Sequence, residues 1–145
     1  MNEQNVVDIL LVEDNPRDAE MTIRALKKHS LANRLIHVED GEQAMNFLFG
    51  QGRYQNRAEA LPPRVVFLDL KLPKVNGLEV LKAIRADART HAVPVVMVTS
   101  SAEDPDIQAA YDLGANSYVI KPVEFGAFME VMETLGFYWL AVNHL

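Results

Sequence analysis

The sequence alternates between short apolar runs and amphipathic segments, and this alternation limits the possible folds most strongly. Each of five strand-like runs is followed by a helix-like segment; the runs are VVDILLVED, NRLIHVED, RVVFLDL, VPVVMVTS and NSYVIKP. Strands this continuously apolar lack the polar alternation of a half-exposed sheet, so both faces of the sheet must be covered. The pattern predicts an α/β fold: a doubly wound, five-stranded parallel sheet with helices on both faces.

The predicted helices carry recognisable start and stop signals. After the first strand, Asn15 suits the cap, Pro16 the first helical position and Asp18 the first turn. Gly114 is typical of a helix C-terminus, and a last helix is predicted from about Glu124. These signals place the helix boundaries between the strands.

Composition narrows the classes of partner. The chain has 145 residues, of which 49% are hydrophobic and 23% charged, which suits one domain with a full core. Its net charge of -6 argues against unspecific binding to nucleic acid or an anionic membrane. Cysteine is absent, which excludes disulfides and thiolate sites, and the N-terminal apolar stretch is too short to cross a bilayer. We therefore expect a cytoplasmic protein whose partners are proteins and small ions.

Polar side chains stand where four of the predicted strands end, and ligands of doubly wound folds bind beyond that edge of the sheet. They are Glu13, Asp14, Asp69, Thr99 and Lys121. A single acid there would favour a helix cap, but two like charges about 4 Å apart repel by roughly 4 kcal/mol at an effective dielectric near 20. A hard cation such as Mg²⁺ offsets three converging acids and leaves positions open for phosphate oxygens. For the lysine alone, a structural bridge to the acids remains an alternative.

Phosphoryl transfer is the chemistry that this set of side chains fits. A carboxylate can accept a phosphoryl group covalently, and Asp69 is the best nucleophile because the end of a buried strand holds it rigidly. The hydroxyl of Thr99 and the ammonium of Lys121 would donate hydrogen bonds to the transferred group.

Four motifs, ILLVEDNP, FLDLKLPKVNG, VMVTSS and YVIKP, together resemble the receiver domain of two-component response regulators over nearly the whole chain. The resemblance implies a flavodoxin-like strand order of 2-1-3-4-5. It implies that Asp69 takes a phosphoryl group from a histidine kinase and relays it by conformational change to protein partners. It also implies catalytic contacts from Thr99 and Lys121, and a switch made of Thr99 and Tyr118. The metal ligands that it implies for Mg²⁺ are Glu13, Asp14, Asp69 and the main-chain carbonyl of Lys71.

Two features depart from the usual family pattern. The segment FGQGRYQNRAEALPPR, residues 49–64, is longer than usual, and its composition predicts a loop, either an insertion or a kinase contact. No output domain follows the fifth helix, so we expect one receiver domain over residues 1–145. Its opening, long loop and aromatic tail resemble the single-domain regulators that pair with phytochrome-type histidine kinases.

The C-terminal segment contains more apolar surface than one covering helix requires. Phe128, Met132, Leu135, Trp139 and Val142 follow helical spacing and are predicted to face the core. The apolar residues outside that stripe are Phe137, Tyr138, Leu140 and Leu145. We therefore predict a helical extension from about residue 136 and a homodimer through the last helix and this tail. The alternative is a tail that folds back over its own domain at Gly136.

Three other functions compete with the phosphoacceptor. A degenerate receiver would bind proteins without phosphate, which the intact set of acids, threonine and lysine argues against. A haloacid-dehalogenase-type phosphohydrolase requires an aspartate two residues after the nucleophile, where Lys71 stands. A flavin-binding flavodoxin requires a phosphate-cradling loop, whereas EDNPRD is acidic. We expect no enzyme acting on an outside substrate, only one that assists its own phosphorylation and dephosphorylation.

Overall fold

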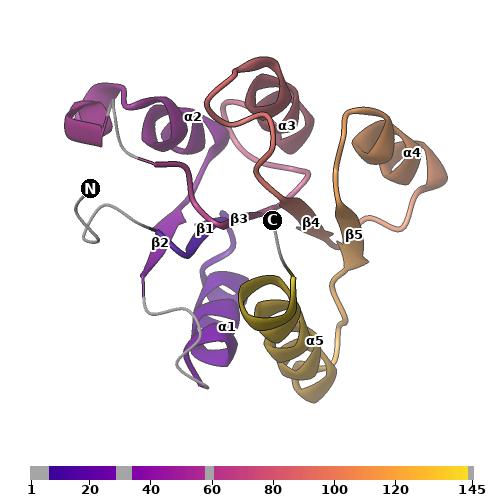
Figure 1. Cartoon of the computed structure of the whole chain (residues 1–145). Coiled ribbons are helices and arrows are strands. Elements are labelled where there is room, and N and C mark those ends of the chain that lie inside the picture. Colours follow the sequence, from indigo (N-terminus) through magenta and orange to yellow (C-terminus); the bar gives the residue numbers. More distant parts are fainter. Residues whose placement is uncertain (1–6, 29–33, 58–60, 144–145) are drawn as a thin grey trace.

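The computed structural model describes residues 7–28, 34–57 and 61–143. In this part of the chain five strands form one parallel sheet in the order β2-β1-β3-β4-β5 (Figure 1). The strands are β1 (Ile9–Val12), β2 (Leu35–Val38), β3 (Val65–Leu68), β4 (Val95–Thr99) and β5 (Ser117–Ile120). The predicted fold class and strand order are confirmed.

Helices cover both faces of this sheet (Figure 1). One face carries α1 (Pro16–Lys27) and α5 (Phe125–Phe137), and the other carries α2 (Gly41–Phe49), α3 (Gly77–Ala86) and α4 (Asp104–Asp112). Two apolar cores result, because successive strand residues point to opposite faces. In β1, Leu10 and Val12 belong to the core under α2 to α4, whereas Ile9 and Leu11 belong to the core under α1 and α5.

The helix boundaries follow the local signals in the sequence. The side chain of Asn15 accepts a hydrogen bond from the Asp18 N–H at 3.1 Å, and α1 begins at Pro16. Glu124 caps α5 by accepting from the N–H groups of two residues in its first turn. After α4, Gly114 has a φ of +99°, a left-handed conformation that glycine adopts without a Cβ clash. The predicted roles of Asn15 and Gly114 at helix ends and the predicted start of the last helix near Glu124 are confirmed.

Part of the segment predicted as a loop is helical. Residues 52–57 form a short 3₁₀ segment, η2 (Gly52–Arg57), with a kink at Tyr54. Tyr54 packs edge-on against the buried Phe47 ring, with centroids 5.2 Å apart, and the Arg57 guanidinium lies 3.8 Å from the centre of the same ring. The loop prediction was wrong here because contacts with α2 outweigh the turn-forming composition of the segment. Residues 58–60 lie outside the described residues.

The chain after α5 continues through a π-helical turn, η3 (Tyr138–Val142), with an i→i+5 hydrogen bond of 2.7 Å from Asn143 N to Tyr138 O. A π turn contains more residues than an α turn, so it rotates the following side chains about the helix axis. Leu140 is therefore buried, at 8% exposed, and Val142 is 47% exposed.

The side chains of the tail follow the predicted pattern of burial in part. Phe128, Met132 and Trp139 are buried as predicted. The predicted places of Leu140 and Val142 were wrong, since a regular α-helical spacing does not hold beyond Phe137. Leu145 lies outside the described residues. No helix in the described ranges is long and apolar enough to span a bilayer.

Candidate functional site

Three predicted acids meet at the carboxyl edge of the sheet. Strands β1 and β3 are paired up to Val12 and Leu68, and the Asp69 N–H donates to the Val12 carbonyl at 3.1 Å. Carboxylate oxygens of Glu13, Asp14 and Asp69 all lie within 4.8 Å of one another. Glu13 and Asp69 are buried and Asp14 is exposed, so the cluster is rigid on one side and open to solvent on the other.

A glycine allows α3 to start directly behind Asp69. A Cβ placed on Gly77 would lie 2.1 Å from the Asp69 carbonyl oxygen, so any larger residue would displace the end of β3. The Gly77 N–H donates to the Leu70 carbonyl at 2.8 Å, and the Asn76 side chain caps α3. The Asn-Gly pair therefore fixes the backbone that presents Asp69.

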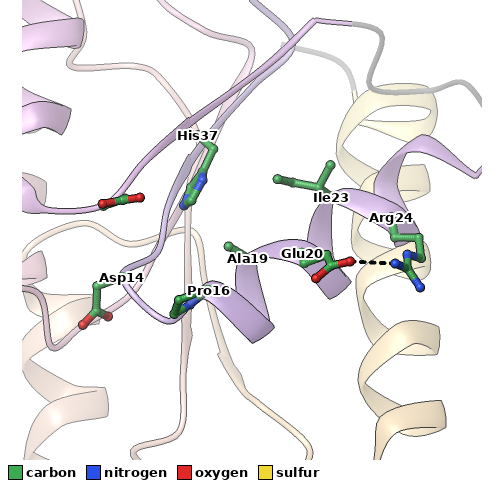
Figure 2. A pocket seen from close by; sticks show the side chains of 8 residues that line it. Asp14, Pro16, Ala19, Glu20, Ile23, Arg24 and His37 are labelled. Atoms are coloured by element: carbon green, nitrogen blue, oxygen red, sulfur yellow. Dashed lines mark hydrogen bonds and ion pairs between the residues drawn. The ribbon is translucent and has the colours of Figure 1, made fainter.

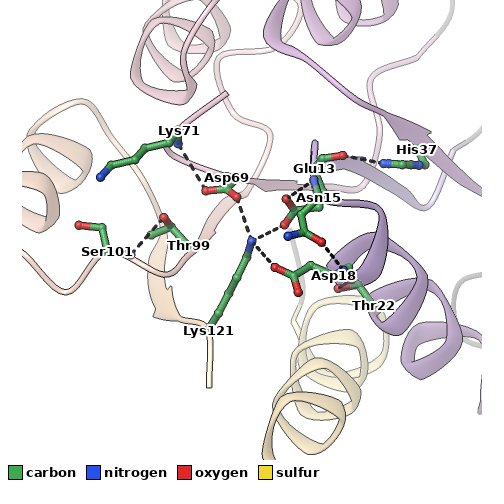
Figure 3. A network of polar contacts seen from close by, with 10 residues as sticks. All are labelled: Glu13, Asn15, Asp18, Thr22, His37, Asp69, Lys71, Thr99, Ser101 and Lys121. Carbon is green, nitrogen blue, oxygen red and sulfur yellow. Dashed lines mark hydrogen bonds and ion pairs between the residues drawn. The ribbon is translucent and has the colours of Figure 1, made fainter. Parts of the chain in front are cut away.

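Lys121 follows β5 and reaches into the acid cluster, where its Nζ contacts three carboxylates (Figure 3). It lies 2.5 Å from Glu13 Oε1, 2.9 Å from Asp69 Oδ2 and 3.0 Å from Asp18 Oδ2. The lysine side chain is 8% exposed. The pairing with the acids that the sequence left open is thus present, and the ammonium touches the predicted nucleophile directly.

Burial and ion pairing shift the pKa values of Glu13 and Lys121 in opposite directions. Burial raises the pKa of the Glu13 carboxyl to about 7, the bond from Lys121 opposes the rise, and the neighbouring Asp69 charge adds to it. Burial by itself would lower the pKa of Lys121, but the contacts with Glu13 and Asp69 outweigh burial and raise it above its usual value. The ammonium therefore stays charged. The site disfavours the charged form of the Glu13 carboxyl, and a further cation would stabilise that form.

The donor set fits a hard divalent cation. All of its side-chain donors are carboxylate oxygens, which Mg²⁺ prefers, and the exposed Asp14 leaves room for the waters that Mg²⁺ retains. Lys71 lies beside the cluster, and its N–H donates to Asp69 Oδ1 at 3.4 Å. A ligand role for the Lys71 carbonyl stays a prediction.

Thr99 and Tyr118 are connected through Ser101 in the loop after β4. Thr99 is buried at the end of β4, and its Oγ1 accepts a hydrogen bond from the Ser101 N–H at 3.4 Å. Tyr118 is half-buried on β5, and its hydroxyl donates to the Ser101 carbonyl at 3.0 Å. Both predicted switch residues therefore contact the same loop, although their part in a relay stays a prediction.

Sequence reasoning missed three residues of the site. Asp18 was assigned only to the first turn of α1, yet it contacts Lys121; its place in the first helical turn directly after the acidic strand end was the available signal. Ser101 is buried and its Oγ donates to Asp106 at 2.5 Å. A ring nitrogen of His37, Nε2, lies 2.8 Å from the Glu13 carbonyl oxygen, a contact for which the sequence gives no signal.

A surface pocket of about 440 Å³ adjoins the cluster and shares Asp14 with it (Figure 2). Pro16, Ala19 and Ile23 supply apolar surface. Charged and polar side chains complete the lining: Asp14, Glu20, Arg24, His37 and Glu39. Because Arg24 pairs with Glu20 at 2.7 Å, the unpaired formal charge of this lining is acidic.

The fold and the acid cluster are those of a signalling receiver, and comparison with known families identifies the class. The family model described as the response regulator receiver domain matches residues 9–133. The chain therefore belongs to the response regulator receiver family.

Two individual relatives show what the chain resembles within this family. It is 40% identical over 135 residues to FilR2 of Methanothrix harundinacea, a "probable methanogenesis regulatory protein", covering 93% of this chain and 84% of that one. It is 36% identical over 132 residues to the response regulator Rcp1 of Synechocystis, covering 91% and 88% of the two chains.

Solved structures give the same result. The Mn²⁺-bound form of Rcp1 is 34% identical, with a TM-score of 0.88 and coverage of 96% of this chain and 98% of that one. The phosphorylated cyanobacterial phytochrome response regulator RcpA is 34% identical, with a TM-score of 0.89 and coverage of 96% and 97%. The bacteriophytochrome response regulator AtBRR is 44% identical, with a TM-score of 0.75 and coverage of 97% and 96%. The predicted resemblance to phytochrome-associated regulators is confirmed.

Proposed function

We propose that this chain is a phosphoacceptor that takes a phosphoryl group from a histidine kinase onto Asp69 and passes the signal to protein partners. The observation that carries the proposal is the buried Asp69 carboxylate, held 2.9 Å from the Lys121 ammonium within the acid cluster. The similarity to RcpA, whose structure is of a phosphorylated regulator, supports it.

The residues divide the work of one transfer step. An Asp69 carboxylate oxygen attacks phosphorus, a P–O bond forms, and the P–N bond to the kinase histidine breaks, which returns the histidine to the kinase. Lys121 would then donate to a phosphoryl oxygen, and Thr99 to another. Glu13, Asp14, Asp69 and the Lys71 carbonyl would hold Mg²⁺, which supplies positive charge against the phosphoryl group.

A relay is proposed through the loop after β4. Phosphorylation would draw the Thr99 hydroxyl away from the Ser101 N–H, and the Tyr118 hydroxyl, bonded to the Ser101 carbonyl, would respond. A Thr99→Ala variant should still accept phosphate but lose the phosphate-dependent change in partner binding. If calorimetry showed this variant responding to phosphorylation as the wild type does, the relay would be rejected.

Intact-mass measurement tests the phosphoacceptor. Incubation with acetyl phosphate and Mg²⁺ should add one phosphoryl group to the wild type, and none to Asp69→Asn or to a sample with EDTA. Glu20→Gln, which removes an exposed acid paired with Arg24 outside the cluster, is the matched control and should label normally. Equal labelling of Asp69→Asn would refute the assignment to Asp69, whereas a wild type that takes up no phosphoryl group would favour the degenerate-receiver alternative.

The proposed partner is a phytochrome-type histidine kinase, by analogy with the regulators RcpA and AtBRR. The acidic pocket beside Asp14 offers a surface next to the nucleophile on which a kinase could dock. A single receiver domain over residues 1–145 and a cytoplasmic location remain predictions.

A homodimer through α5 and the tail is proposed on the remaining exposed apolar side chains, Phe137, Tyr138 and Val142. The tail also folds back on its own domain, because Trp139 and Leu140 are buried there. Truncation would therefore damage the core, and substitution of the three exposed residues by serine is the better test. Analytical ultracentrifugation should show a dimer for the wild type and a monomer for the variant; a monomeric wild type at micromolar concentration would refute the dimer.

A further inference from the structure

We propose that Asp18 is a positioning residue, which holds the Lys121 ammonium in place when Glu13 and Asp69 engage the cation and the phosphoryl group. The inference rests on the proposed phosphoacceptor function and adds a residue to it.

The contacts of Lys121 carry the inference. An ammonium has three N–H donors, and here three carboxylates lie within 3.0 Å of Nζ, from Glu13, Asp69 and Asp18. In the proposed reaction two of these partners change. The Asp69 oxygen that bonds to phosphorus loses its charge, and Glu13 becomes a metal ligand. Asp18 is then the partner that keeps a free carboxylate for the lysine.

The local structure makes Asp18 a fixed anchor. It lies in the first turn of α1, where its N–H donates to the Asn15 cap at 3.1 Å and its carbonyl accepts from the buried Thr22 hydroxyl at 2.8 Å. Its side chain is 21% exposed, between the buried cluster and the surface. Helix α1 packs against α5, so the anchor belongs to the rigid body of the domain. Figure 3 shows the Asp18 carboxylate and the two cluster acids converging on the end of Lys121.

Whether removal of Asp18 weakens or strengthens anion binding distinguishes a positioning role from a purely electrostatic one. If Asp18 acted only through its negative charge, its removal would strengthen the binding of a phosphoryl-like anion to Asp69, since like charges repel. If Asp18 positions Lys121, its removal lets the ammonium move away from the phosphoryl oxygens, and anion binding weakens. A neutral residue that still accepts a hydrogen bond would then restore part of the loss.

Calorimetry with beryllofluoride and Mg²⁺, a stable mimic of the phosphoryl group, tests this. Asp18→Ala should bind beryllofluoride about tenfold more weakly than the wild type, and Asp18→Asn should lie between the two, as expected for one charge-assisted hydrogen bond. Glu42→Gln removes an exposed acid of α2 that lies outside both the acid cluster and the pocket beside Asp14, and should match the wild type within about twofold. Thermal unfolding of each variant confirms that the domain is intact.

The outcomes are distinct. Weaker binding in Asp18→Ala with partial recovery in Asp18→Asn supports the inference. Equal or tighter binding in Asp18→Ala, or Asn no better than Ala, overturns it while leaving the phosphoacceptor in place. Failure of the wild type itself to bind beryllofluoride would refute the proposed function, and the role of Asp18 with it.

Discussion

The carboxyl edge of the sheet and the tail after α5 bury polar groups in different ways. At the edge, the buried ionisable side chains of Glu13 and Asp69 both pair with the ammonium of Lys121, at 2.5 and 2.9 Å. In the tail the buried side chains Trp139 and Leu140 are apolar, and the polar group concerned is a carbonyl in the π turn. The Arg64 guanidinium donates to that carbonyl, Leu140 O, at 2.8 Å.

The two regions should therefore respond to different perturbations. The edge contains more carboxylates than cations, so its stability depends on protons and on added divalent ions. The tail is held to the rest of the domain by buried apolar side chains and by the Arg64 hydrogen bond, so side-chain truncation should destabilise it and divalent ions should have no effect. A site built this way can change its balance of charge when a ligand binds, whereas the tail keeps its shape.

Removal of the buried cation should have the largest effect on stability. Lys121→Met leaves Glu13 and Asp69 buried without their ammonium, and should lower the free energy of unfolding by about 3 kcal/mol in EDTA. Added Mg²⁺ should restore part of this loss, because the ion binds the folded acids. Urea unfolding measures both effects, and Lys82→Met, an exposed lysine on α3, is the control. Identical stability of the two variants would show that the edge is not held by charge.

Truncation in the tail should give a slightly smaller loss that does not depend on ions. Leu140→Ala removes a buried side chain and should cost about 2.5 kcal/mol, whereas the exposed Val142→Ala should cost under about 0.5 kcal/mol. The same urea series, with and without Mg²⁺, checks this pair. A larger loss for Val142→Ala would mean that the tail is a regular α-helix and that the π turn is wrong.

Much of this contrast is explained by what the sequence can and cannot encode locally. Parallel strands end at one edge, so Glu13, Asp69, Thr99 and Lys121 could be brought together from the strand pattern. The family motifs added Tyr118. Structure was needed for contacts that depend on the packing of whole elements: the reach of Asp18 from α1 to Lys121 spans 103 positions, and that of Arg64 to Leu140 spans 76. Without the latter contact, helical spacing alone placed Val142 in the core.

Counted per pH unit, the pH dependence of cation binding should be the smallest of these effects. Because the pKa of Glu13 is about 7 in the folded protein and 4.5 for an ordinary glutamate, the folded protein keeps a proton between these values that the unfolded chain has lost. Stability without Mg²⁺ should therefore fall as pH rises through this window. Mg²⁺ must displace that proton, so its affinity should rise with pH by up to about tenfold per unit and level off above about 7. Calorimetric titration measures the affinity; a profile for Glu13→Gln as steep as that of the wild type would assign the dependence to another group.

The cluster at the carboxyl edge should direct phosphorylation to Asp69, and mapping the phosphoryl group tests this most directly. The chain is phosphorylated with acetyl phosphate and Mg²⁺ and treated with borohydride, which reduces an aspartyl phosphate to homoserine, and the digest is sequenced by tandem mass spectrometry. Homoserine should appear at position 69 alone, and not in a sample treated without Mg²⁺. Homoserine at position 14 or 18 in place of 69, or none at any position, would contradict the account.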